Sequence, residues 1–93
     1  MAVGDILNGI FTNVAALNYF QPAAGTETMV LAVSGYSNMW TGLANGVNTA
    51  ATLFYNASNP NKNSLNIKLG ITNTNYLVVF FDTEGGYSGI QIK

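Results

Sequence analysis

Apolar and polar residues alternate strictly over residues 65 to 71 of this chain. The apolar positions are Leu65, Ile67, Leu69 and Ile71, and the positions between them are Asn66, Lys68 and Gly70. Successive side chains of an extended chain point to opposite faces, so this period of two places the apolar residues on one face of a β-strand. No segment repeats apolar residues at the 3.6-residue spacing of a helix over three turns. The sequence therefore predicts an all-β protein.

Two further segments, Tyr76 to Phe81 and Thr28 to Ser34, read as strands that are apolar on both faces. In a two-layer domain one face of a strand lies in the core, so a second apolar face needs cover from a long loop or a neighbouring subunit. In the first segment Tyr76, Val78 and Phe80 oppose Leu77, Val79 and Phe81, and in the second Met29, Leu31 and Val33 oppose Val30 and Ala32. The candidate oligomer interface predicted from these faces comprises Leu77, Val79, Phe81, Val30 and Ala32.

Weaker strand patterns and turn residues complete the predicted organisation. The weaker strands are Ile6 to Val14, Met39 to Gly42, Thr49 to Asn56 and Tyr87 to Ile92. Turn residues predict a turn at Gln21 to Gly25, an exposed loop at Asn56 to Asn63 and a closing hairpin at Glu84-Gly85-Gly86. Seven or eight short strands in 93 residues predict one domain over residues 1–93, a small antiparallel β-sandwich or jelly-roll-like fold.

Charged residues make up only 8% of the chain, against about 25% in a typical soluble domain. Three lysines and no arginine are too few cations for tight binding to nucleic acid. No basic segment followed by a long apolar run opens the chain, and no stretch approaches the roughly 20 apolar residues that span a bilayer, so we expect synthesis in a cytoplasm and no membrane partner. A surface with so little charge does little to repel a neighbouring subunit.

The chain contains no His, Cys or Arg, the residues on which most hydrolase and transferase mechanisms depend. We therefore predict a non-enzymatic protein with no catalytic residue, no cofactor and no assigned metal site. Asp82 and Glu84 form the one carboxylate pair, for which a glycosidase-like role or a Ca²⁺ site is conceivable. Acidic residues beside a Gly-Gly turn are usually solvated turn residues, and whether a calcium ion binds near them stays open.

Aromatic residues near Asn-rich segments are candidates for contact with a protein or a sugar, because a flat apolar ring stacks on a pyranose. Tyr36, Trp40, Tyr55 and Tyr87 fit this description, and the alternative for each is a place in the core. Trp40 lies in a turn-like context between Asn38 and Gly42. Tyr36 and Trp40 are the candidate partner contacts.

Three segments of the chain carry a resemblance to a known class of proteins. They are Met1-Ala2-Val3-Gly4-Asp5-Ile6-Leu7, Gln21-Pro22-Ala23-Ala24-Gly25-Thr26-Glu27-Thr28-Met29-Val30-Leu31 and Tyr87-Ser88-Gly89-Ile90-Gln91-Ile92-Lys93. Together they resemble short virion structural proteins of tailed bacteriophages. The resemblance implies a β-sandwich or jelly-roll subunit, often trimeric, that decorates a capsid or forms part of a tail or fibre, and it carries no catalytic residues.

The resulting hypothesis is a non-enzymatic structural protein of a tailed-phage virion, assembled in the host cytoplasm. It would be a capsid decoration subunit that forms a homo-oligomer, a trimer first, and contacts other virion proteins such as the major capsid protein. The alternative is a host-attachment or carbohydrate-binding module at a tail or fibre tip, with a host surface glycan as its partner.

Overall fold

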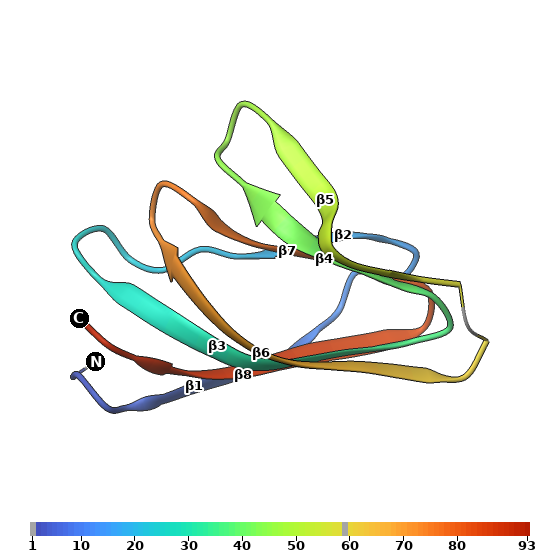
Figure 1. Cartoon of the computed structure of the whole chain (residues 1–93), viewed down its shortest axis with the longest axis horizontal. Helices are drawn as coiled ribbons and strands as arrows, with labels where there is room; N and C mark the ends of the chain where they lie inside the picture. The colour runs from blue at the N-terminus through green and yellow to red at the C-terminus, as the bar shows by residue number, and fades with distance from the viewer. Residues whose placement is uncertain (1, 59) are drawn as a thin grey trace.

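The computed structural model describes residues 2–58 and 60–93 and shows an all-β domain, in which two four-stranded antiparallel sheets pack as a β-sandwich (Figure 1). Sheet A has the strand order β1-β8-β3-β6, and sheet B has the order β2-β7-β4-β5. The predicted fold class is confirmed. The strands are β1 (Ile6–Phe11), β2 (Ala16–Phe20), β3 (Glu27–Tyr36), β4 (Met39–Ala44), β5 (Thr49–Ala57), β6 (Lys62–Thr72), β7 (Tyr76–Phe81) and β8 (Glu84–Gln91).

The strand pairs are nested around the β4–β5 hairpin. Strand β4 pairs with β5, β3 with β6, β2 with β7 and β1 with β8, all antiparallel. Further pairings of β3 with β8 and of β4 with β7 join these hairpins into the two sheets. The chain thus forms one long hairpin that is rolled into a sandwich, which is the jelly-roll arrangement.

Strand β2 was not predicted from the sequence, because a polar residue occupies an inward position at its centre. Asn18 is buried, and its Nδ2 donates to the carbonyl oxygens of Asn13 at 2.8 Å and Ala16 at 3.1 Å. Its Oδ1 accepts from the Asn13 backbone N–H at 3.2 Å. These bonds satisfy the amide inside the protein, so an apolar residue is not needed there.

The predicted hairpin at Glu84-Gly85-Gly86 is wrong. All three residues belong to β8, and residues 82–83 carry the chain from sheet B to sheet A. A Cβ atom on Gly85 would lie 2.5 Å from the Phe81 ring, and one on Gly86 would lie 2.7 Å from the carbonyl oxygen of Gly9. Both glycines are therefore required for close packing within the sandwich.

Strand β7 is buried on both faces by its own chain. Leu77, Val79 and Phe81 lie in the hydrophobic core between the sheets, and Val78 on the opposite face has no exposed surface either. Gly42 lies opposite Val78 in the neighbouring strand, and a Cβ on Gly42 would overlap the backbone carbonyl of Ala50. The β5 backbone therefore crosses the outer face of sheet B at this point.

An irregularity in β5 makes this crossing possible. The β4–β5 register steps from Thr41 opposite Tyr55 to Leu43 opposite Ala50, so β5 contains extra residues between these two pairs. The resulting bulge bends the strand toward Gly42. A segment of the same chain thus supplies the cover that the sequence pattern assigned to a loop or a neighbouring subunit.

The predicted oligomer interface is corrected by this packing. Leu77, Val79 and Phe81 have no exposed surface in the folded subunit, and neither does Val30. Relative to β8, β3 contains an extra residue between Val30 and Ala32, and this bulge turns Val30 and Val33 to the same, inner face, although strict alternation would separate them. These side chains cannot form an interface between folded subunits. Ala32 is partly exposed on the outer face of sheet A.

Replacing Gly42 with Ala should destabilise the domain by about 1–3 kcal/mol, because the new methyl group displaces the Ala50 backbone. Gly70→Ala is the matched control, since nothing lies within 4 Å of a Cβ at that position. It should leave stability unchanged or raise it by up to about 1 kcal/mol. Denaturant unfolding of both variants provides the measurement, and equal midpoints would contradict the described path of β5.

Replacing Thr41 with Val should stabilise the protein. The Thr41 hydroxyl is buried and forms no hydrogen bond within the described residues. Removing such a group should raise the free energy of unfolding by about 1 kcal/mol, equivalent to about 4–8 °C in melting temperature for a domain of this size. Thr49→Val, at an exposed position, should change the melting temperature little. A lower melting temperature for Thr41→Val would show that the hydroxyl has a partner.

Candidate functional site

The outer face of sheet A carries charged and aromatic side chains in one row across three strands. In the register of the sheet, Tyr36 on β3 lies opposite Glu84 on β8 and opposite Lys62 on β6. The next row on the same face has Ser34 at its centre, with Gly86 on one side and Ser64 on the other. Neighbouring β-strands therefore bring together residues that are far apart in the sequence.

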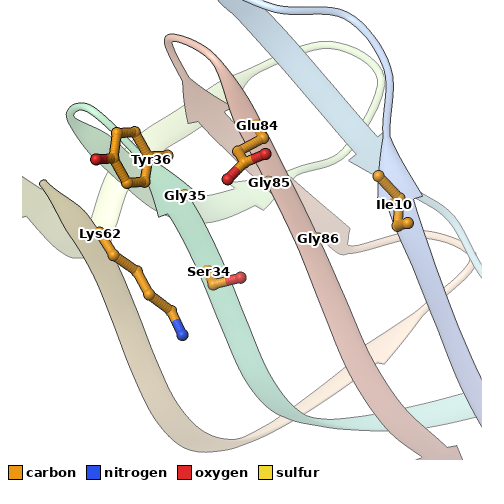
Figure 2. A pocket seen from close by; sticks show the side chains of 8 residues that line it. All are labelled: Ile10, Ser34, Gly35, Tyr36, Lys62, Glu84, Gly85 and Gly86. Atoms are coloured by element: carbon orange, nitrogen blue, oxygen red, sulfur yellow. The ribbon is translucent and has the colours of Figure 1, made fainter.

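A shallow trough of about 400 Å³ lies over these rows (Figure 2). Gly86 leaves its floor open because it has no side chain. In Figure 2 the Ser34 side chain lies between Lys62 on one side and Ile10 on the other, with Tyr36 and Glu84 toward one end. The lining residues are Ile10, Ser34, Gly35, Tyr36, Lys62, Glu84, Gly85 and Gly86.

The two charged residues of the trough stand on either side of the Tyr36 strand. Each neighbouring strand adds about 4.8 Å, so the backbones of Lys62 and Glu84 are about 10 Å apart. Within the described residues neither side chain forms an ion pair, whereas Lys93 Nζ and Glu27 Oε2 approach to 3.6 Å elsewhere. The trough thus presents an ammonium donor and a carboxylate acceptor to the same space.

Asp82 and Glu84 lie in different surroundings. Asp82 lies beyond the end of β7, and its Oδ2 accepts a hydrogen bond of 2.7 Å from Asn38 Nδ2. Its backbone N–H donates to the carbonyl of Ser37 at 3.2 Å. Asp82 therefore ties the connection after β7 to the corner between β3 and β4, while Glu84 lines the trough. The described residues include no cluster of three or more His, Cys, Asp and Glu residues suited to a metal ion.

The four aromatic candidates divide between surface and core. Tyr36 is 42% exposed in the trough. Trp40 is partly buried on the outer face of sheet B, where it stacks on Phe80 with a centroid distance of 4.4 Å. Tyr55 and Tyr87 are partly buried against the core. Because Tyr36 and Trp40 lie on the outer faces of different sheets, they cannot belong to one contact site.

The edges of the sandwich differ in how they are protected against pairing with another chain. On one side, β6 carries Lys62 and Lys68, and β5 contains the bulge described above. On the other side, β1 and β2 have no charged residue and no proline, and they pair regularly with β8 and β7. Lysines and bulges are devices that prevent edge-to-edge association. The β1 side of the sandwich lacks them.

The unprotected edge also carries exposed apolar side chains, which sequence analysis did not identify. Ile6 is 71% exposed and Ile10 is 85% exposed, both on the outer face of sheet A. Ile6 lies opposite Ile90 on β8, which in turn lies opposite Met29 on β3. The sequence does show the alternation of Ile6, Asn8 and Ile10 with the inward Leu7, but this alternation does not distinguish an edge strand from a central one.

Comparison with protein-family models, with curated proteins and with solved structures returns no match. Within the described residues there is no helix of the length and apolarity needed to cross a membrane.

Burial raises the pKa of the Tyr87 phenol above its ordinary value of 10.0. The folded protein therefore holds this proton more tightly than the unfolded chain does. The resulting stability is fully present below pH 10 and is lost as the pH rises toward the pKa of the folded state. We expect the denaturant midpoint of the parent to fall above about pH 10, and Tyr87→Phe to remove that part of the decline. An identical decline in both proteins would contradict this assignment.

Proposed function

We propose that this protein is a non-enzymatic structural subunit of a tailed-phage virion that self-associates through the β1 side of its sandwich. The observation that carries the proposal is the contrast between the two sides. Lysines and a bulge protect β6 and β5, whereas β1 is a regular, uncharged edge. An edge of this kind offers backbone N–H and C=O groups to a further strand.

The side chains beside this edge favour burial. The row formed by Ile6, Ile90 and Met29 gives the outer face of sheet A an apolar end, and contacts there would accompany strand pairing. The chain has a formal net charge of -1, so copies repel one another only weakly. A second copy is therefore the occupant that this surface fits, with other virion proteins such as the major capsid protein as further partners in the assembled particle.

The symmetry of the assembly follows from which surfaces meet. Pairing of β1 with β1 of a second copy would be isologous and would give a dimer, whereas contact of β1 with a different surface would close a ring. The resemblance to phage virion proteins favours a trimer, and therefore the second arrangement. Decoration of a capsid is the role that this resemblance implies for the assembled ring.

Light scattering at micromolar concentration tests the proposal. The parent should form a discrete oligomer, and the double variant Ile6→Lys with Asn8→Lys should be a folded monomer, because two lysines are placed beside the unprotected edge. The matched control is Val47→Lys in the β4–β5 turn, where Val47 is 86% exposed, combined with Thr49→Lys at the start of β5. This control adds the same charge on the other side of the sandwich and should leave the oligomer unchanged.

A parent that scatters as a monomer throughout this concentration range would overturn the proposed self-association. Equal dissociation of both double variants would also overturn it, because added charge alone would then be the cause. Co-purification of the parent with intact phage particles, and its loss in the Ile6→Lys and Asn8→Lys variant, would support the place of the protein in a virion.

A further inference from the structure

We propose that the trough on the outer face of sheet A binds a neutral saccharide, with Tyr36 as the stacking platform and Glu84, Lys62 and Ser34 as partners for its hydroxyl groups. These four residues lie outside β1, the strand through which we propose assembly. Its volume of about 400 Å³ lies within the usual range of about 300–1,000 Å³ for small-molecule sites.

The functional groups of the trough complement a polyol. A carboxylate only accepts hydrogen bonds, an ammonium group only donates them, and a hydroxyl does both. Glu84, Lys62 and Ser34 supply one group of each kind around the same space. Each sugar hydroxyl both donates and accepts, so all three side chains can bond to one ligand.

The aromatic ring and the charge balance narrow the class of ligand. Tyr36 is 42% exposed between the two charged residues, and its ring can pack against the apolar face of a pyranose. The positive charge of Lys62 and the negative charge of Glu84 cancel at longer range. A strongly anionic or cationic ligand would meet one favourable and one unfavourable charge, so the site favours a neutral sugar.

The open floor of the trough is a consequence of the fold. A side chain on Gly86 would collide with the backbone oxygen of Gly9, so this position stays empty. Ser34 and Ser64 beside it are small and polar. Ile10 forms the far wall from β1 and adds an apolar surface to that of the Tyr36 ring.

The stacking residue of the trough lies away from the apolar end of sheet A. Tyr36 is seven residues further along β3 than Met29, which corresponds to about 23 Å at the usual rise of a strand. Ile6 and Met29 lie toward one end, and Tyr36 and Glu84 lie at the other. The two surfaces share Ile10, which lies on β1, but Tyr36, Glu84 and Lys62 lie on β3, β8 and β6, away from the β1 edge.

Two-dimensional amide NMR of the full-length protein tests the site, with methyl glucoside, methyl galactoside, methyl mannoside and N-acetylglucosamine titrated separately to millimolar concentrations. At least one sugar should produce saturable shifts at Ser34, Tyr36, Glu84 and Gly86. Tyr36→Ala should weaken this binding about tenfold or more, while Tyr36→Phe should retain it, because the ring is kept. Glu84→Gln should weaken it less, since the amide can still accept a hydrogen bond.

Tyr19→Ala is the matched control, because Tyr19 is 48% exposed on the outer face of sheet B. It should leave binding unchanged. The proposal is overturned if none of the four sugars shifts the trough residues, if the shifts map instead to the Trp40 face, or if Tyr36→Ala binds as tightly as the parent. Spectra of the parent and of all variants without sugar show whether each protein is folded. If Tyr36→Ala is unfolded, the weaker sugar binding expected of Glu84→Gln serves as the test.

Discussion

The Phe81 side chain occupies the space that Gly35 and Gly85 leave between the two sheets. A Cβ atom would lie 3.0 Å from the Phe81 side chain at Gly35 and 2.5 Å from it at Gly85, so a larger residue would be tightly crowded at Gly35 and would displace the Phe81 ring at Gly85. Both glycines point inward, and alternation then directs Ser34, Tyr36, Glu84 and Gly86 outward. The packing of one aromatic ring in the core thus sets which side chains line the trough on the opposite surface.

The cover of β7 by its own chain changes where association is expected. A strand that is apolar on both faces indicates a buried partner surface, and here that surface is intramolecular, because β5 crosses the outer face of sheet B at Gly42. Among the apolar side chains that remain accessible, Ile6 and Ile10 lie on the regular edge strand β1, whereas Leu53 and Phe54 lie on the bulged strand β5. The low charge of the chain favours association whichever strand is involved, but the strand concerned is β1 and not β7.

The fold class and most strands were predictable, because inward residues such as Leu65 and Ile71 alternate with polar ones. Strand β2 was missed because the inward Asn18 hides its alternation, and the faces of β3 were misassigned because a bulge relative to β8 shifts their phase. Tyr36 was identified as an exposed aromatic residue. Lys62 was not identified, and Glu84 was considered only together with Asp82, because only the sheet register places these residues beside Tyr36, 26 and 48 positions along the chain.

The nested strand pairing has a consequence for folding kinetics. The β4–β5 hairpin closes the shortest loop, and each outer pair encloses a longer one, so β1–β8 has the largest loop-closure entropy (Figure 1). Such non-local pairing places the protein among slowly folding β topologies, with folding times of about milliseconds to seconds. While β1 is undocked, β8 is an edge strand that presents Gly85, Gly86 and Gly89. When β1 pairs with β8, it covers that edge and becomes the new edge strand of the sheet. A newly made subunit therefore presents β1 to other chains only once its folding is complete.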